Sequence, residues 1–309
     1  MGLAFEQTPS PNVSVMTHEQ GASASESPSA AVPSAAAPAS DDRYARGLAA
    51  LRLVTGTEYP TALDSLEEIA PDLARYTIEF GYGDIWTRPG LTPRQRQIAT
   101  IAALSAMGNA APQLRFHIDG ALNVGCTRRE IVETFIHTTV YAGFPAALNA
   151  LAAAREVFAA RPQEEEREDA AGSGSDADAS GASADGDRYA RGLDALRAVD
   201  GPEGVHVVAS LDDIAPDLGR YLIEYVFGDV YARTGLDLPT RELASVAMCT
   251  ALGTAAPQLR VHLRGFLNVG GTREEIVEVL IQMAGYAGFP AALNALTAAK
   301  EIFAERDKD

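Results

Sequence analysis

The sequence is poor in cysteine and in aromatic residues, which excludes several kinds of site. Its two cysteines, Cys126 and Cys249, form neither a Cys-x-x-Cys pair nor a zinc-ligand spacing. We therefore expect two free, buried thiols. Aromatic residues make up 7% of the 309 residues, although 47% of the chain is hydrophobic. Most apolar positions are thus Ala, Leu, Ile or Val, which is typical of helical proteins.

Positive charge and long hydrophobic runs are also scarce. The formal net charge of −17 argues against nucleic acid as a partner, since phosphates repel an acidic chain. No apolar stretch reaches the roughly 18 residues that a membrane-spanning helix needs. The N-terminus lacks the basic start and apolar run of a signal peptide. We expect a cytoplasmic protein with no membrane partner.

What the chain does contain is one sequence written twice. The stretch Ala111–His117 returns as Ala256–His262, so that the two histidines lie 145 positions apart (262 − 117). The stretch Tyr141–Ala150 returns as Tyr286–Ala295 at the same offset. The repeat needs no gap and predicts two domains, which we place at 42–162 and 187–309.

The segments outside the repeat have a different composition. Residues 1–41 are rich in Ser, Ala and Pro, and we expect them to be disordered because they cannot bury enough apolar surface. Residues 163–186 read as a flexible acidic linker, long enough to let the two copies take independent orientations.

Within each copy, all the signals for the start and end of secondary structure are those of helices. Prolines at helix starts and a Thr-x-x-Glu capping box divide the first copy into segments, marked by Pro71, Pro93, Pro112, Thr127 and Pro145. No convincing alternating strand occurs. We predict an all-α fold with about six helices per copy.

The residues best suited to chemistry are Glu242 and His262. A short connection makes their two helices antiparallel neighbours, which brings the carboxylate within reach of the imidazole. Such a pair in an apolar pocket can move protons near neutral pH. Gln258 lies four residues before His262 and shares its helix face. The alternative is an ordinary core histidine, with Glu242 pairing at the surface.

The first copy keeps only part of this set. Gln113 and His117 are present, but Gln97 occupies the place of Glu242, and an amide cannot exchange a proton near pH 7. His137, whose counterpart is Gln282, could supply a different base in the first copy or simply pack in its core.

Four further side chains are candidates for substrate binding. Arg96 and Arg241 could bind a carboxylate, although arginines on helices often face solvent. Tyr141 and Tyr286 precede a tight helix break and could line a pocket, or pack as aromatic residues at a helix end.

The runs Pro-Gln-Leu-Arg-x-His, Gly-x-Thr-Arg-x-Glu-Ile and Tyr-Ala-Gly-Phe-Pro-Ala-Ala resemble the carboxymuconolactone decarboxylase family, relatives of the alkyl hydroperoxidase D-type proteins. The resemblance implies all-α subunits in trimers or hexamers, so that three tandem chains would make a pseudo-hexamer. One branch of the family reduces peroxides with a Cys-x-x-Cys pair. Its places are taken here by Ala110 and Gln113, and by Ala255 and Gln258, which excludes that dithiol chemistry.

By the same resemblance, the activity would be cofactor-independent decarboxylation, or a related proton shift, on a small lactone or unsaturated carbonyl acid. His262 would donate the proton, and Glu242 would orient His262 or act as the acid/base itself. Gln258 would contact the substrate. His117, Gln97 and Gln113 would form an equivalent but altered pocket. The alternative is a non-catalytic ligand-binding or assembly protein that uses the same helical pocket.

Overall fold

The computed structural model describes residues 40–58, 60–161 and 185–308, and these residues form helices and loops with no strand. The all-α prediction is therefore confirmed. All but the last two residues of the predicted disordered segment, and all but the last two of the predicted linker, lie outside the described residues; the exceptions begin the first helix of each copy. No helix among the described residues is long and apolar enough to cross a membrane.

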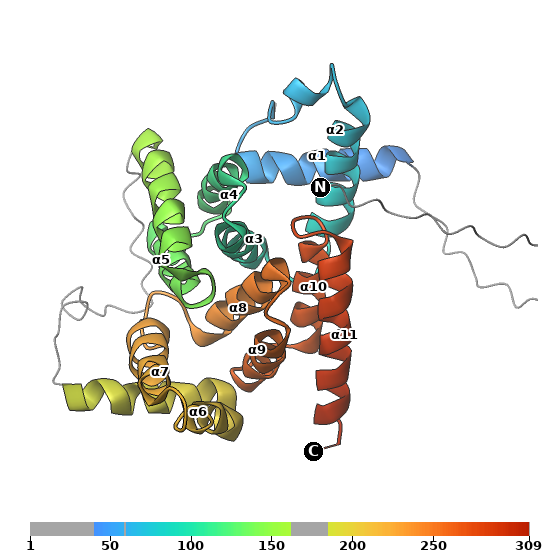
Figure 1. Cartoon of the computed structure of the whole chain (residues 1–309). Coiled ribbons are helices and arrows are strands. Elements are labelled where there is room, and N and C mark those ends of the chain that lie inside the picture. The colour runs from blue at the N-terminus through green and yellow to red at the C-terminus, as the bar shows by residue number, and fades with distance from the viewer. Residues whose placement is uncertain (1–39, 59, 162–184, 309) are drawn as a thin grey trace, which may run out of the picture. The chain divides into compact units, whose positions relative to one another are not determined.

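The helices of the two copies follow the same order with two differences (Figure 1). The first copy contains α1 (Ser40–Thr55), η1 (Asp64–Leu66), α2 (Pro71–Tyr76), η2 (Thr77–Trp86), α3 (Pro93–Met107), α4 (Ala111–Asn123) and α5 (Arg128–Ala160). The second copy contains α6 (Asp185–Ala209), α7 (Pro216–Tyr221), η4 (Leu222–Tyr231), α8 (Leu238–Leu252), α9 (Ala256–Asn268), α10 (Arg273–Met283) and α11 (Phe289–Arg306). The short helix η1 is replaced by a turn in the second copy, and the bent helix α5 corresponds to the two helices α10 and α11.

Helix starts follow the predicted signals. Pro71 and Pro93 are the first residues of α2 and α3, and the Thr127 hydroxyl accepts a hydrogen bond from the Glu130 backbone in the capping box of α5. The break before Pro145 occurs at Gly143, whose φ of 81° bends α5. Only glycine adopts this conformation readily.

The sequence does not predict the two π-helices, η2 (Thr77–Trp86) and η4 (Leu222–Tyr231). Each extends a short α-helix and ends at an aromatic residue, Trp86 in the first copy and Tyr231 in the second. π-Helical segments are rare and often occur at functional sites.

The two copies share their hydrophobic core, so the expectation of independent orientations is wrong. α3 of the first copy packs along α8 of the second (Figure 1). The core of the second copy includes Ala99 and Ala103 from α3, and the core of the first includes Ala244 and Met248 from α8. Separating the copies would expose these buried side chains to water.

Two buried ion clusters also join the copies. Glu278 of the second copy accepts from Arg88 and Arg96 of the first, at 2.6 and 3.0 Å. Their repeat equivalents, Glu133, Arg233 and Arg241, form the same cluster with the roles of the copies exchanged. Arg96 and Arg241 are almost completely buried, so their charges depend on these partners.

Candidate functional site

The hairpin of α8 and α9 brings the predicted acid/base pair together. Oε2 of Glu242 lies 3.0 Å from Nδ1 of His262, and both residues belong to the second copy. Gly265 permits this approach, because a Cβ atom at that position would lie 2.6 Å from the Glu242 carboxylate oxygen. Glu242 is completely buried and His262 is 8% exposed, so the pair is buried and only a small part of the imidazole reaches the surface.

The other side of the histidine is occupied by the first copy. The Tyr141 hydroxyl lies 3.1 Å from Nε2 of His262 and 2.8 Å from both the Tyr231 hydroxyl and the Ser245 hydroxyl. Tyr141 has one proton and can donate it to only one of these partners at a time. The site therefore contains a tyrosine whose hydrogen bond can be redirected to a ligand.

Tyr231 completes the network by donating to Oε1 of Glu242 at 2.5 Å. Neither Tyr231 nor Ser245 was among the candidate residues taken from the sequence. The usable signal was the repeat itself. The residue equivalent to Tyr231 in the first copy is Trp86, and the residue equivalent to Glu242 is Gln97. The tyrosine and the carboxylate are therefore both specific to the second copy.

His137, a residue of the first copy, also belongs to the site around His262. We expected it to lie in the site of the first copy or in its core. Its Nε2 lies 2.8 Å from the Ser245 hydroxyl of α8, and its ring packs against Tyr141 and Tyr231. The reason is the packing of α5 of the first copy against α8 of the second. His137 is fully buried, and burial holds its pKa well below the usual value, so it stays neutral.

The carboxylate of Glu242 changes the protonation of His262. Burial alone would lower the pKa of this histidine, but the charge of Glu242 and its hydrogen bond outweigh burial, and Asp200 adds to them. The net result is a raised pKa, so the imidazolium form persists to a higher pH than in a free histidine. Burial, reinforced by Glu242, raises the pKa of Tyr141 and Tyr231 well above the usual value, so both hydroxyls keep their protons.

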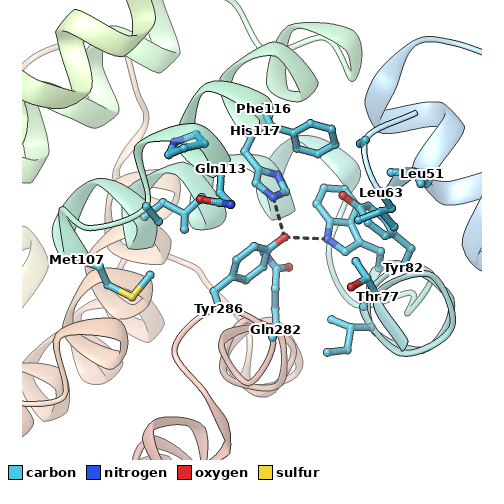
Figure 2. A pocket seen from close by; sticks show the side chains of 18 of the residues that line it. Leu51, Leu63, Thr77, Tyr82, Met107, Gln113, Phe116, His117, Gln282 and Tyr286 are labelled. Atoms are coloured by element: carbon cyan, nitrogen blue, oxygen red, sulfur yellow. Dashed lines mark hydrogen bonds between the residues drawn. The ribbon is translucent and has the colours of Figure 1, made fainter. Parts of the chain in front are cut away.

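The first copy contains the equivalent arrangement, but without a carboxylate beside the histidine (Figure 2). Oε1 of Gln97 lies 3.1 Å from Nδ1 of His117. The Tyr286 hydroxyl, from the second copy, lies 3.4 Å from Nε2 of His117 and accepts a hydrogen bond from Nε1 of Trp86 at 3.2 Å. Burial lowers the pKa of His117 to about 3, so this imidazole is neutral.

A cavity of about 650 Å³ lies at this first-copy site. It is bounded by η2, α4 and the end of α10, with Trp86, Gln113, His117 and Tyr286 in its wall (Figure 2). The cavity and the carboxylate therefore belong to different sites of the chain. For chemistry we give more weight to the titratable pair than to cavity size, because proton transfer requires a group that changes charge.

The predicted glutamines take different positions. Gln113 lies in the cavity wall at the start of α4. Gln258 is exposed on the first turn of α9, four residues before His262.

The two arginines lie elsewhere, and this corrects the sequence interpretation. Arg96 and Arg241 were candidates for binding a substrate carboxylate. Both guanidinium groups are instead buried in ion pairs with glutamates of the opposite copy. We therefore assign them to the junction between copies.

The cysteines are buried as expected, and burial raises the pKa of each thiol to about 12. Neither is a reactive thiolate. Within residues 40–58, 60–161 and 185–308, no three His, Cys, Asp or Glu side chains form a group that could hold a metal ion.

Comparison with known proteins agrees with this architecture. The model of the carboxymuconolactone decarboxylase family matches the chain twice, over residues 71–156 and 216–301. A crystal structure from Burkholderia xenovorans LB400, provisionally described as a gamma-carboxymuconolactone decarboxylase subunit, is similar with a TM-score of 0.50 and 25% identity. The similarity covers 85% of this chain and 98% of that protein.

Curated relatives match about one copy of the repeat. The 4-carboxymuconolactone decarboxylase of Acinetobacter baylyi is 35% identical over 119 residues, which is 38% of this chain and 88% of the relative. The nitrosuccinic acid decarboxylase of Metarhizium robertsii is 31% identical over 109 residues, 35% of this chain and 76% of the relative. An uncharacterised 15.0 kDa protein of Paracoccus denitrificans is 36% identical over 101 residues, which is 32% of this chain and 75% of the relative. The chain belongs to the carboxymuconolactone decarboxylase family.

Proposed function

We propose that this protein is a cofactor-independent decarboxylase, or a closely related isomerase, whose acid/base pair is Glu242 and His262. The observation that carries the proposal is the 3.0 Å contact between the buried carboxylate and an imidazole whose other nitrogen faces the Tyr141 hydroxyl. Two of the curated relatives described above are named as decarboxylases, which favours this reaction class.

The proposed substrate is a small lactone or unsaturated acid whose carboxylate is attached to the carbon next to a carbonyl, or to a carbon linked to that carbonyl through a C=C bond. The carbon–carbon bond to the carboxylate breaks, CO2 leaves, and the electron pair passes into the conjugated carbonyl to form an enolate. Tyr141 turns its hydroxyl proton toward the enolate oxygen, which stabilises the negative charge. The Nε2 proton of His262 then passes to carbon, and solvent restores it. Gln258 contacts the substrate from the site's exposed side.

Glu242 has two tasks in this scheme. Its Oε2 fixes the ring of His262, and its charge keeps the imidazole protonated until the proton is needed. Tyr231 holds the other carboxylate oxygen, so that Glu242 keeps one orientation. The same pair could move a proton between two carbons of an unsaturated lactone, which is the isomerase form of the proposal.

A test follows directly. Loss of 4-carboxymuconolactone is followed by ultraviolet absorbance for the unaltered chain, Glu242→Gln, His262→Ala and the matched variant His117→Ala. We expect turnover to fall by about 10²–10⁴-fold in the first two variants and to change little in the third. Equal losses in His262→Ala and His117→Ala would overturn the assignment to the second copy.

The alternative, a binding protein without turnover, is favoured by one observation. The first-copy site has a cavity but no titratable pair that works near neutral pH. Absence of turnover with a series of lactones and unsaturated keto acids, combined with saturable binding of one of them, would favour this alternative.

We further propose that the chain assembles with copies of itself. Ile69 and Ile214, at equivalent positions, are 80% and 77% exposed, and Phe144 and Phe289 are also exposed as an equivalent pair. Large apolar side chains repeated on both copies are typical of surfaces that other subunits cover. Three tandem chains would form a pseudo-hexamer. Light scattering coupled to size exclusion should give three times the mass of 32.6 kDa, and a stable monomer would refute the assembly.

A further inference from the structure

The first-copy cavity has a chemical character of its own. None of the side chains that line it is Asp, Glu, Lys or Arg. We propose that this cavity binds an uncharged small molecule with a ring and one carbonyl or amide oxygen, and holds it without turnover. This inference goes beyond the proposed function, because it concerns the other site of the chain.

The absence of charge in the wall excludes an anion as the preferred ligand. A carboxylate moved from water into an uncharged cavity loses hydration that only a cation or several donors can replace. Three titratable side chains line the cavity. His117 stays neutral because burial holds its pKa at about 3, and Tyr82 and Tyr286 keep their protons because burial raises the pKa of each. In the second copy, by contrast, Glu242 raises the pKa of the equivalent histidine, which favours its charged form.

The wall is suited to a ring. Tyr82, Trp86 and Phe116 present aromatic surfaces, and Leu51 and Leu63 add aliphatic ones (Figure 2). A cavity of about 650 Å³ is within the size range of small-molecule sites. Phe116 is replaced by Val261 at the equivalent position of the second copy, whereas Tyr82 and Trp86 correspond to the aromatic residues Phe227 and Tyr231. The Phe116 ring is therefore the part of this wall that is specific to the first copy.

Polar groups for one oxygen are present at the same place. The Tyr286 hydroxyl lies 3.4 Å from Nε2 of His117, a contact at the long end of the hydrogen-bond range. The hydroxyl can therefore turn toward a ligand oxygen at little cost. Gln113 carries an amide donor on the cavity wall, close to His117 (Figure 2).

The chain contains a single tryptophan, Trp86, and it lines this cavity. Its fluorescence is thus a built-in reporter of the site. The probes are cyclohexanecarboxamide and cyclohexanecarboxylate, which share a ring and a size and differ in charge. Titrations at pH 7.5 follow the emission of Trp86 and are repeated by calorimetry.

We expect saturable binding of the amide and at least about tenfold weaker binding of the carboxylate. The variant Gln113→Arg adds a cation at an exposed position of the wall and should reverse that preference. Its matched control, Gln258→Arg, changes the equivalent residue of the second copy and should leave the Trp86 titration unchanged. Equal or tighter binding of the carboxylate to the unaltered chain would overturn the proposal, as would no saturation by the amide up to about 10 mM.

A turnover assay separates this proposal from the proposed function. In His262→Ala the amide titration should be unchanged whether or not activity is lost. Inhibition of turnover by the amide, with a constant equal to its Kd and lost together with it in Gln113→Arg, would place the reaction in this cavity. That result would overturn binding without turnover.

Discussion

The Tyr141 hydroxyl of the first copy lies 3.1 Å from Nε2 of His262 in the second copy. Tyr286 makes the corresponding approach to His117, at 3.4 Å. Each histidine therefore has one neighbour from its own copy, at position 242 or 97, and one from the other copy. Neither site is complete without both halves of the chain, although only one of them contains a carboxylate.

The first prediction concerns the two tyrosines. If Tyr141 stabilises the developing enolate, Tyr141→Phe should lower kcat by about 10²–10³-fold with a small effect on KM, because the hydrogen bond strengthens only in the transition state. Tyr286→Phe is the matched control and should keep nearly full turnover. Steady-state kinetics with 4-carboxymuconolactone measure both. A Tyr141→Phe variant that changes only KM would assign the hydroxyl to substrate binding instead.

The second prediction concerns the protonation of the two histidines. His262 should titrate above its ordinary pKa of about 6.5, and Glu242→Gln should bring that pKa down, because burial then acts without the opposing charge. Conversely, Gln97→Glu should raise the pKa of His117 from about 3. Proton NMR of the imidazole signals as a function of pH measures both values, with His262→Ala and His117→Ala used for assignment among the five histidines.

The same shift has a consequence for stability. Because the folded-state pKa of His262 is raised, its contribution is fully present below the unfolded pKa of about 6.5 and is lost as the pH rises through the folded value. The free energy of unfolding should therefore fall across this range more steeply in the unaltered chain than in Glu242→Gln. Parallel curves would show that the pair is not ionised as proposed.

Part of this site was accessible from the sequence. Glu242 and His262 lie on consecutive helices joined by a short turn, so local rules on helix starts and connections were enough to predict their proximity. The placement of Tyr141 and His137 was not accessible in this way. It depends on how α5 packs against α8, and the spacing of residues along one helix carries no information on the helix that it meets. The π-helical form of η4, which presents Tyr231 to Glu242, has no marker in its composition.

The third prediction tests the junction between copies. Glu278→Gln or Glu133→Gln leaves a buried guanidinium without its counter-charge, which should cost about 3–5 kcal/mol in the free energy of unfolding. Glu156→Gln removes a solvent-exposed partner of Arg115 and should cost about 1 kcal/mol or less. Urea unfolding at pH 7.5 gives these values. Similar small costs for all three variants would mean that the core, and not the ion clusters, joins the copies.

The junction also predicts a loss of stability in acid. Burial opposes ionisation of Glu133 and Glu278, but hydrogen bonds from their arginines outweigh it, so that both pKa values are lowered in the folded state. Their contribution is present above the unfolded pKa of about 4.3 and is lost as the pH falls through the folded values. Unfolding curves from pH 6 to pH 3 should show a steeper decline for the unaltered chain than for Glu133→Gln. A decline of equal slope would argue against ionised glutamates at the junction.

The last prediction concerns Asp200, a second carboxylate close to the acid/base pair. Burial raises its pKa to about 6, with Glu242 contributing in the same direction and His262 in the opposite one. Its Oδ1 is buried and has no hydrogen-bond partner. The equivalent residue of the first copy is Thr55, so this carboxylate occurs only beside the charged pair.

A raised folded-state pKa for an acid means that the folded chain binds a proton more tightly than the unfolded chain, so Asp200 costs stability as the pH rises from about 3.8 to about 6. Asp200→Asn should therefore stabilise the fold by up to about 3 kcal/mol at pH 7.5 and by little at pH 4. The variant should also lower the pKa of His262, which Asp200 helps to raise, and so slow proton donation. Thermal unfolding at the two pH values and the pH profile of kcat measure these effects. A more stable variant with an unchanged profile would separate Asp200 from the chemistry, and a less stable one would contradict the cost that its burial implies.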